Sequence, residues 1–193
     1  MGLDPLPGPR LVVAARYDQS PVGAYRELAV AEPARLGARV GMCVTTMVVT
    51  TPEARLRGRA QWGMPKELGA LDWFEDGEVR VLRWVERDVE VRGDPLGPPL
   101  PTLVPFRTLQ RRSDGPVSAS AHLRGLARAA RVEIGVPQGD PLDWLEGRHL
   151  GTVVASARLV MGEACPGEGP RVPGRVTRQA PEPALSWGSC PGD

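Results

Sequence analysis

The 193-residue sequence contains a single lysine, Lys66, and no asparagine. Apart from two histidines, every other basic residue is an arginine, and the arginines are interspersed with acidic residues so that the formal net charge is +1. Neither a basic block nor an alternation of aromatic and basic residues occurs, although both are typical of proteins that bind nucleic acids. We therefore expect no nucleic-acid partner.

Metal and nucleotide signatures are also missing. The three cysteines, Cys43, Cys165 and Cys190, lie far apart without a Cys-x-x-Cys pair, which argues against a structural zinc site. His122 and His149 have no carboxylates arranged around them as a ligand set. The sequence has no Gly-x-Gly-x-x-Gly, phosphate loop or Gly-x-Ser-x-Gly elbow. We therefore expect neither a metal nor an organic cofactor.

Long apolar runs are absent too. No segment is long enough to cross a bilayer, and the N-terminus lacks a basic region followed by an apolar stretch. These features predict a soluble cytoplasmic protein without a membrane partner. The length favours one domain, which we place at residues 1–164. Residues 165–193 are dense in proline and glycine and are predicted to form a C-terminal tail.

The sequence is rich in strand signals. Short β-branched or alternating runs are typical of strands, and Asp76-Gly77 is a strong hairpin turn signal. The proline-rich segment 94–101 is predicted to cross the surface between strands. A mainly antiparallel β-sandwich or barrel follows, with strands at residues 11–17, 25–31, 39–51, 79–91, 102–109, 119–134 and 151–162.

One helix is predicted before Lys66. Thr51 is a suitable N-cap and is followed by Pro52 and an acidic residue, as is common in first turns. Residues 53–61 are good helix formers, and Gly63 then ends the helix. Lys66 should therefore lie just past the helix, on the segment that leads into the next strand.

Lys66 is the candidate nucleophile. It lies in sequence between Trp62, Met64 and Leu68. Apolar surroundings penalise the ammonium form of a lysine and lower its pKa, and a neutral lysine can form a Schiff base with a ketone or aldehyde. The alternative is a solvated surface lysine, left over in a composition that replaces lysine by arginine.

Two motifs carry a family resemblance. The first is Ser20-Pro21-Val22-Gly23-Ala24-Tyr25-Arg26-Glu27, and the second spans residues 58–69. Together they resemble the acetoacetate decarboxylase family over residues 17–71, with identical residues at Gly23, Tyr25, Glu27, Gly58, Arg59, Pro65, Lys66, Leu68 and Gly69. The resemblance implies a closed, double-layered, cone-like β-fold. It also implies a Schiff-base lysine at Lys66 and an active-site carboxylate at Glu27.

The resemblance also guides the choice of substrate-binding residues. Arg59 is a candidate to hold a substrate carboxylate, and its alternative is a structural pair at the helix end. Tyr25 is either a pocket wall or a core residue. Trp62 and Met64 complete the expected apolar pocket. Glu67 stands where the family's decarboxylases carry a second lysine.

Three functions are compatible with these residues. The first is a Schiff-base-forming lyase that acts on a small β-keto acid. The second is an aldolase or dehydratase that uses the same lysine, with Glu67 or Glu27 as the base. The third is a non-catalytic protein that binds a carbonyl ligand or serves in assembly on the same fold. All three imply a keto acid, ketone or aldehyde as the ligand, and we expect a homo-oligomer.

Overall fold

The computed structural model describes residues 2–166 of the chain, so residues 167–193 of the predicted tail lie outside the described residues. The elements follow in the order β1 (Asp4–Pro5), β2 (Leu11–Tyr17), β3 (Tyr25–Leu36), β4 (Arg39–Val49), α1 (Pro52–Trp62), β5 (Lys66–Leu68), β6 (Leu71–Asp76), β7 (Val79–Trp84), the 3-10 turn η1 (Val85–Arg87), β8 (Val89–Arg112), β9 (Gly115–Gly135), the 3-10 turn η2 (Asp143–Leu145), β10 (Gly147–Met161) and β11 (Cys165–Pro166). The predicted mainly β class with one α-helix is confirmed.

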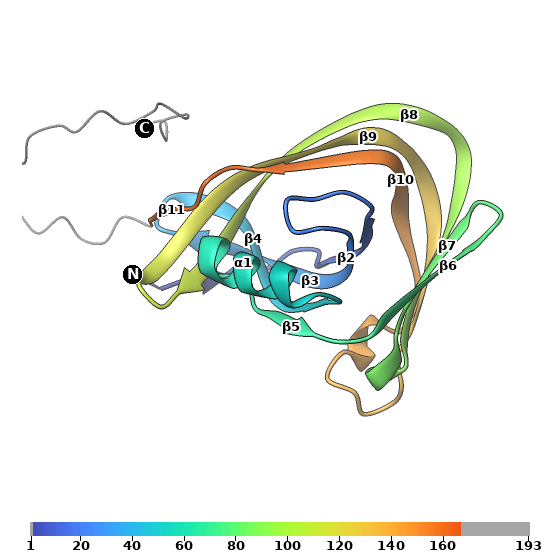
Figure 1. The fold of residues 1–193 in the computed structure, drawn as a ribbon, viewed down its shortest axis with the longest axis horizontal. Coiled ribbons are helices and arrows are strands. Elements are labelled where there is room, and N and C mark those ends of the chain that lie inside the picture. The colour runs from blue at the N-terminus through green and yellow to red at the C-terminus, as the bar shows by residue number, and fades with distance from the viewer. Residues whose placement is uncertain (1, 167–193) are drawn as a thin grey trace, which may run out of the picture.

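All the strands belong to a single sheet. Its central path runs β1-β3-β4-β8-β7-β6, while β2 pairs with β3, β5 with β4, and β10 and β11 with β9, which itself pairs with β8. The pairs are antiparallel except β4–β5 and β4–β8. Within residues 2–166 no pairing joins the ends of this path, so the predicted closure into a barrel is not confirmed. Instead, β8, β9 and β10 form a curved arch beside the other strands (Figure 1).

The strand β3 separates two packed faces of the sheet. Because successive side chains of a strand point to opposite faces, Leu28 and Val30 join one cluster and Ala29 and Ala31 join another. The first cluster is the main core and contains the buried residues Leu28, Val30, Val48, Leu71, Leu82, Trp84, Val89, Val91, Ile134, Val136, Leu142 and Leu145. The second face is the one on which Lys66 lies.

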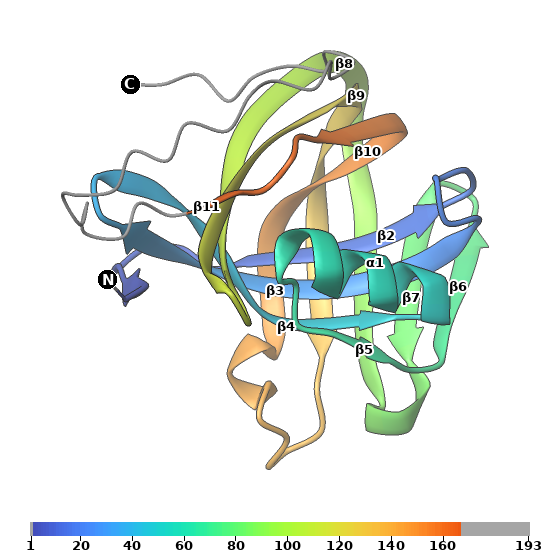
Figure 2. The same cartoon turned by 60° about the vertical axis from the view of Figure 1, so that its left-hand side comes forward.

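The helix α1 forms where the sequence predicts it. The side chain of Thr51 caps the first turn by accepting a hydrogen bond from the backbone N–H of Ala54 at 3.4 Å, and Pro52 begins the helix. Gly63 ends it in the left-handed conformation with φ of 67°, which glycine adopts without steric cost. Figure 2 shows α1 lying next to β4 and β5.

The predicted strand at residues 79–91 is wrong in one respect. The turn at Asp76-Gly77 does join β6 to β7, as expected. The alternating run that follows is two strands rather than one, because η1 reverses the chain and Asp88 takes a left-handed conformation with φ of 52°. Consequently β7 and β8 form a second hairpin, in which Trp84 lies opposite Val89.

The predicted surface crossing at residues 94–101 is also wrong, because this segment belongs to β8. Proline lacks the N–H that an interior strand needs and is tolerated at sheet edges and bulges. Here β8 pairs with β7 only up to Gly93 and with β4 at Thr108. Within the described residues, the part of β8 between Gly93 and Thr108 therefore pairs only with β9. A register shift between Leu96 and Leu100 adds a bulge. The predicted strands 102–109 and 119–134 fall within β8 and β9, and the strand predicted at 151–162 ends one residue past β10.

Candidate active site

Lys66 is the first residue of β5 and is buried. This short strand pairs in parallel with β4, where Lys66 lies opposite Met47. Met47 in turn lies opposite Ala29 of β3. Directly opposed residues of neighbouring strands share a face of the sheet. The lysine side chain therefore extends over the face of β3 that carries Ala29 and, two residues earlier, Glu27.

Glu27 meets the lysine amine on this face. Nζ of Lys66 donates to Oε2 of Glu27 at 2.7 Å, and the two side chains are only 7% and 6% exposed. An ion pair this deeply buried is retained only when its geometry compensates for lost hydration. The surroundings of the amine differ from the apolar ones expected. Met64 packs into the cluster around Ala29, and Leu68 is 45% exposed.

Two tyrosines complete the polar group. Tyr17 and Tyr25 lie opposite each other on β2 and β3, with ring centroids 4.6 Å apart. The hydroxyl of Tyr17 donates to Oε1 of Glu27 at 3.4 Å, and Nζ of Lys66 lies 5.2 Å from the Tyr25 ring centroid, within range of a cation–π contact. Burial, aided by the Glu27 charge, raises the pKa of both phenols well above the usual value. Both therefore stay protonated at neutral pH.

Gly58 explains how α1 comes so close to the lysine. A Cβ atom at this buried helical position would lie 2.5 Å from Cδ and 2.6 Å from Cε of Lys66. Carbon atoms in contact normally stand about 3.5–4.0 Å apart. Only glycine therefore leaves room for the lysine stem beneath the helix, and the glycine before Arg59 in the sequence motif has a direct steric role.

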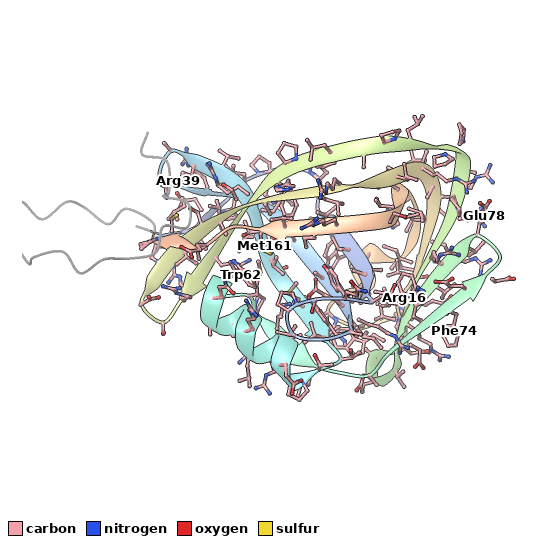
Figure 3. The ribbon with its side chains drawn as sticks, turned by 45° about the horizontal axis from the view of Figure 1, so that its top comes forward. Arg16, Arg39, Trp62, Phe74, Glu78 and Met161 are labelled. Atoms are coloured by element: carbon pink, nitrogen blue, oxygen red, sulfur yellow. The ribbon has the colours of Figure 1, made fainter. Side chains whose placement is uncertain are left out.

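A small cavity opens beside the amine. Its volume is about 90 Å³. The residues lining it come from the β2–β3 loop, α1 and β5, and are Ser20, Pro21, Val22, Tyr25, Ala54, Arg57, Gly58, Trp62 and Lys66. The cavity thus brings together Lys66, Tyr25 and Trp62 of the predicted site, with Glu27 bonded directly to the amine. The indole of Trp62 donates to the carbonyl of Gly162, just after β10, and lies near Met161 (Figure 3).

Two predicted substrate contacts do not line this cavity. Arg59 and Met64 line a larger hollow of about 510 Å³, whose lining does not include Lys66. Nε of Arg59 instead donates to the backbone carbonyl of Lys66 at 2.7 Å, which ties the end of α1 to β5. Glu67 is exposed, so its carboxylate points away from the buried amine next to it in the chain.

Sequence reasoning missed two residues of the site. Tyr17 contacts Glu27, and Arg57 lines the cavity. A signal for Tyr17 was available, because the chain has only two tyrosines, Tyr25 inside the first motif and Tyr17 three residues before it. Arg57 gave no such signal among so many arginines. Its place depends on how α1 is rotated against the sheet.

The sequence around this site matches a known protein family. Residues 2–93 match the acetoacetate decarboxylase (ADC) family model. This match, over just under half of the chain, supports a divergent member of the acetoacetate decarboxylase family. The match contains both sequence motifs and every strand from β1 to β7, and hence the Lys66–Glu27 pair.

Solved structures extend the likeness beyond the matched residues. The acetoacetate decarboxylase of Legionella pneumophila is 16% identical, with a TM-score of 0.57 over 86% of this chain and 74% of that chain. At this identity the likeness concerns the fold. Another acetoacetate decarboxylase structure (16% identity, 74% and 70% coverage) and the enduracididine biosynthesis enzyme MppR complexed with pyruvate (15% identity, 74% and 64% coverage) both give TM-scores of 0.43.

No curated protein matches the sequence significantly. Across residues 2–166, no group of three or more His, Cys, Asp or Glu side chains is placed to hold a metal ion. The same part of the chain has no helix with the length and apolar character needed to cross a membrane. The candidate site is therefore described by its lysine, its carboxylate, its two phenols and the cavity beside them.

Proposed function

We propose that this protein is a Schiff-base-forming lyase that acts on a small β-keto acid or a related carbonyl compound. The observation that carries the proposal is the buried amine of Lys66, held 2.7 Å from Oε2 of Glu27 and lining a cavity of about 90 Å³. An amine used only as a structural cation needs no cavity at its side. An amine that forms an imine needs space for a carbonyl compound and a group that takes up its proton.

The reaction starts with a proton transfer from Nζ of Lys66 to Glu27 along their hydrogen bond. The free amine then adds to the ketone carbon, and loss of water from the carbinolamine leaves an iminium ion. When the carboxylate leaves as carbon dioxide, the electron pair of its C–C bond moves towards the iminium and forms an enamine. Protonation of the enamine carbon and hydrolysis of the imine release the ketone and restore the lysine.

Two contacts of Glu27 support a role for this residue in moving protons at both ends of the reaction. Its Oε2 faces the amine, while Oε1 accepts the hydrogen bond from Tyr17. A carboxylate within hydrogen-bond distance of the reacting nitrogen suits general acid–base catalysis. The two neutral tyrosines pack around the carboxylate without adding charge. Lys66 is therefore the charged partner of Glu27, and its ammonium form loses its counter-charge when Glu27 takes up a proton.

The experiment is reductive trapping. Incubation with acetoacetate or pyruvate and then borohydride should convert the imine into a stable secondary amine, which mass spectrometry locates. The single lysine makes the result clear, because Lys66 and the α-amino group are the only amines of this chain. We expect the mass increase on the peptide that contains Lys66. A wild-type protein left unmodified at Lys66 by every keto acid, ketone and aldehyde tested would refute the proposal.

Two comparisons sharpen the result. Lys66→Arg should abolish trapping, because a guanidinium stays charged and does not form an imine. Product assays then separate the alternatives for the same lysine. Release of carbon dioxide identifies a lyase, carbon–carbon bond formation between pyruvate and an aldehyde identifies an aldolase, and trapping without a released product identifies a binding protein.

A further inference from the structure

We propose that Arg57 binds the carboxylate of the ligand at the mouth of the Lys66 cavity and so selects small oxo acids over neutral carbonyl compounds. The proposal rests on the function proposed above, because it concerns the ligand of the same cavity. It also replaces the expectation that Arg59 binds the substrate, since Arg59 donates to the Lys66 backbone and does not line this cavity.

The position of Arg57 follows from the face that α1 turns towards the sheet. Ala54, Gly58 and Trp62 follow one another at four-residue intervals, so they lie along one side of the helix. Ala54 and Gly58 are buried, whereas Arg57 is exposed and lines the same cavity. The cavity therefore runs from the buried amine of Lys66 to an exposed guanidinium.

Arg57 is also a lining group with donors to spare. The hydroxyl of Ser20 donates to the carbonyl of Gly23 at 2.6 Å and accepts from the N–H of Val22, and the indole of Trp62 donates to Gly162. Within residues 2–166, Arg57 makes one hydrogen bond, a long one of 3.3 Å from Nε to Oε1 of Gln61. Its two terminal nitrogens are thus available for the bidentate grip that guanidinium offers a carboxylate.

Charge and size both favour a small anion. Among residues 2–166, the charged side chains that line the cavity are Arg57 and Lys66, and Glu27 already offsets the charge of Lys66. The remaining positive charge belongs to Arg57. A cavity volume of about 90 Å³ beside the amine suits a small ligand that has one carbonyl and one carboxylate group.

The test compares two probes of similar size and different charge, pyruvate and acetone, in borohydride trapping of Lys66 below saturation. Arg57→Gln should slow trapping by pyruvate about 10- to 100-fold, the range of a lost hydrogen bond to a charged group, and change trapping by acetone less than two-fold. Arg57→Lys should recover part of the loss, because it restores the charge without the planar fork. Arg111→Gln, a change at an exposed arginine lining the larger hollow, should leave both rates unchanged.

The outcomes separate this proposal from the one on which it rests. Equal losses for pyruvate and acetone in Arg57→Gln, or no loss for either, would overturn the role of Arg57 while Lys66 trapping still stands. If the wild type traps neither probe, imine formation fails. Calorimetric titration with pyruvate then tests the role of Arg57. The role is upheld if the wild type binds pyruvate and Arg57→Gln does not. Any other result overturns it. Thermal unfolding of each variant verifies that it is folded.

Discussion

Replacing Gly58 by alanine tests how closely α1 holds the lysine. In an ordinary helix interior this change stabilises a protein by about 0.5–1 kcal/mol, because glycine loses more backbone entropy on folding. Here the new Cβ would lie 2.5 Å from Cδ and 2.6 Å from Cε of Lys66. Restoring normal carbon contacts requires a shift of the lysine stem by about 1 Å.

That shift has separate consequences for stability and for reactivity. Overpacking a buried site costs about 1–3 kcal/mol, so after the helix-propensity gain we expect a net loss of about 0–2.5 kcal/mol for Gly58→Ala. The bond between Nζ of Lys66 and Glu27, now 2.7 Å, would be stretched beyond the usual hydrogen-bond range of about 2.7–3.2 Å. A misplacement of about 1 Å can slow a reaction roughly 100-fold, and we expect a loss of that order in imine formation.

The assay measures the rate of borohydride trapping by pyruvate and the free energy of unfolding in urea for the same samples. Ala60→Gly is a matched control, since Ala60 is exposed on α1 and does not line the Lys66 cavity. It should lower stability by about 1 kcal/mol without changing trapping. A Gly58→Ala variant that gains stability and traps pyruvate at the wild-type rate would refute the packing argument.

Three further predictions concern the polar groups of the fold. Glu27→Gln should destabilise the protein by about 3–5 kcal/mol in urea unfolding, because it leaves the Lys66 ammonium buried without a counter-charge. The same variant should slow borohydride trapping at least 100-fold. Tyr17→Phe removes a long hydrogen bond of 3.4 Å, so the same measurements should show a loss of about 0.5–1 kcal/mol and a change in trapping below five-fold. Partial burial raises the pKa of Asp140, but the hydrogen bonds from Arg87 and a backbone N–H outweigh it and hold the pKa below the usual value. Asp140→Asn should therefore lower the free energy of unfolding at pH 7. The difference in free energy of unfolding from the wild type should shrink as the pH falls below about 3.9. Urea unfolding at pH 7 and pH 3 measures both values.

Local signals in the sequence predicted the parts of the fold that depend on neighbouring residues. The helix caps at Thr51 and Gly63 act within a few residues of chain, and so does the turn at Asp76-Gly77. Patterns that depend on distant partners were harder to interpret. The run at residues 79–91 alternates as a single strand would, yet its two halves pair with each other because η1 folds the chain back.

The candidate site shows the same division. The motifs indicated Lys66 and Glu27, and the structure brings them together from elements 39 residues apart in the chain. The choice between Arg57 and Arg59 could not be made in the same way. Consecutive helical residues are separated by about 100° around the axis, so these arginines lie on either side of Gly58. Only the packing of α1 on the sheet determines which one faces the cavity.

The edge of β8 that has no second strand partner within residues 2–166 bears on how copies of this chain can associate. Between Gly93 and Thr108, where only β9 pairs with it in the described part of the chain, this strand contains Pro95, Pro98, Pro99, Pro101 and Pro105. An exposed edge strand can pair with another chain, which extends the sheet. Proline lacks the backbone N–H donor that such pairing needs. The edge is therefore a poor template for extending the sheet, and side-chain contacts are the more favourable way for a second copy to meet the arch here.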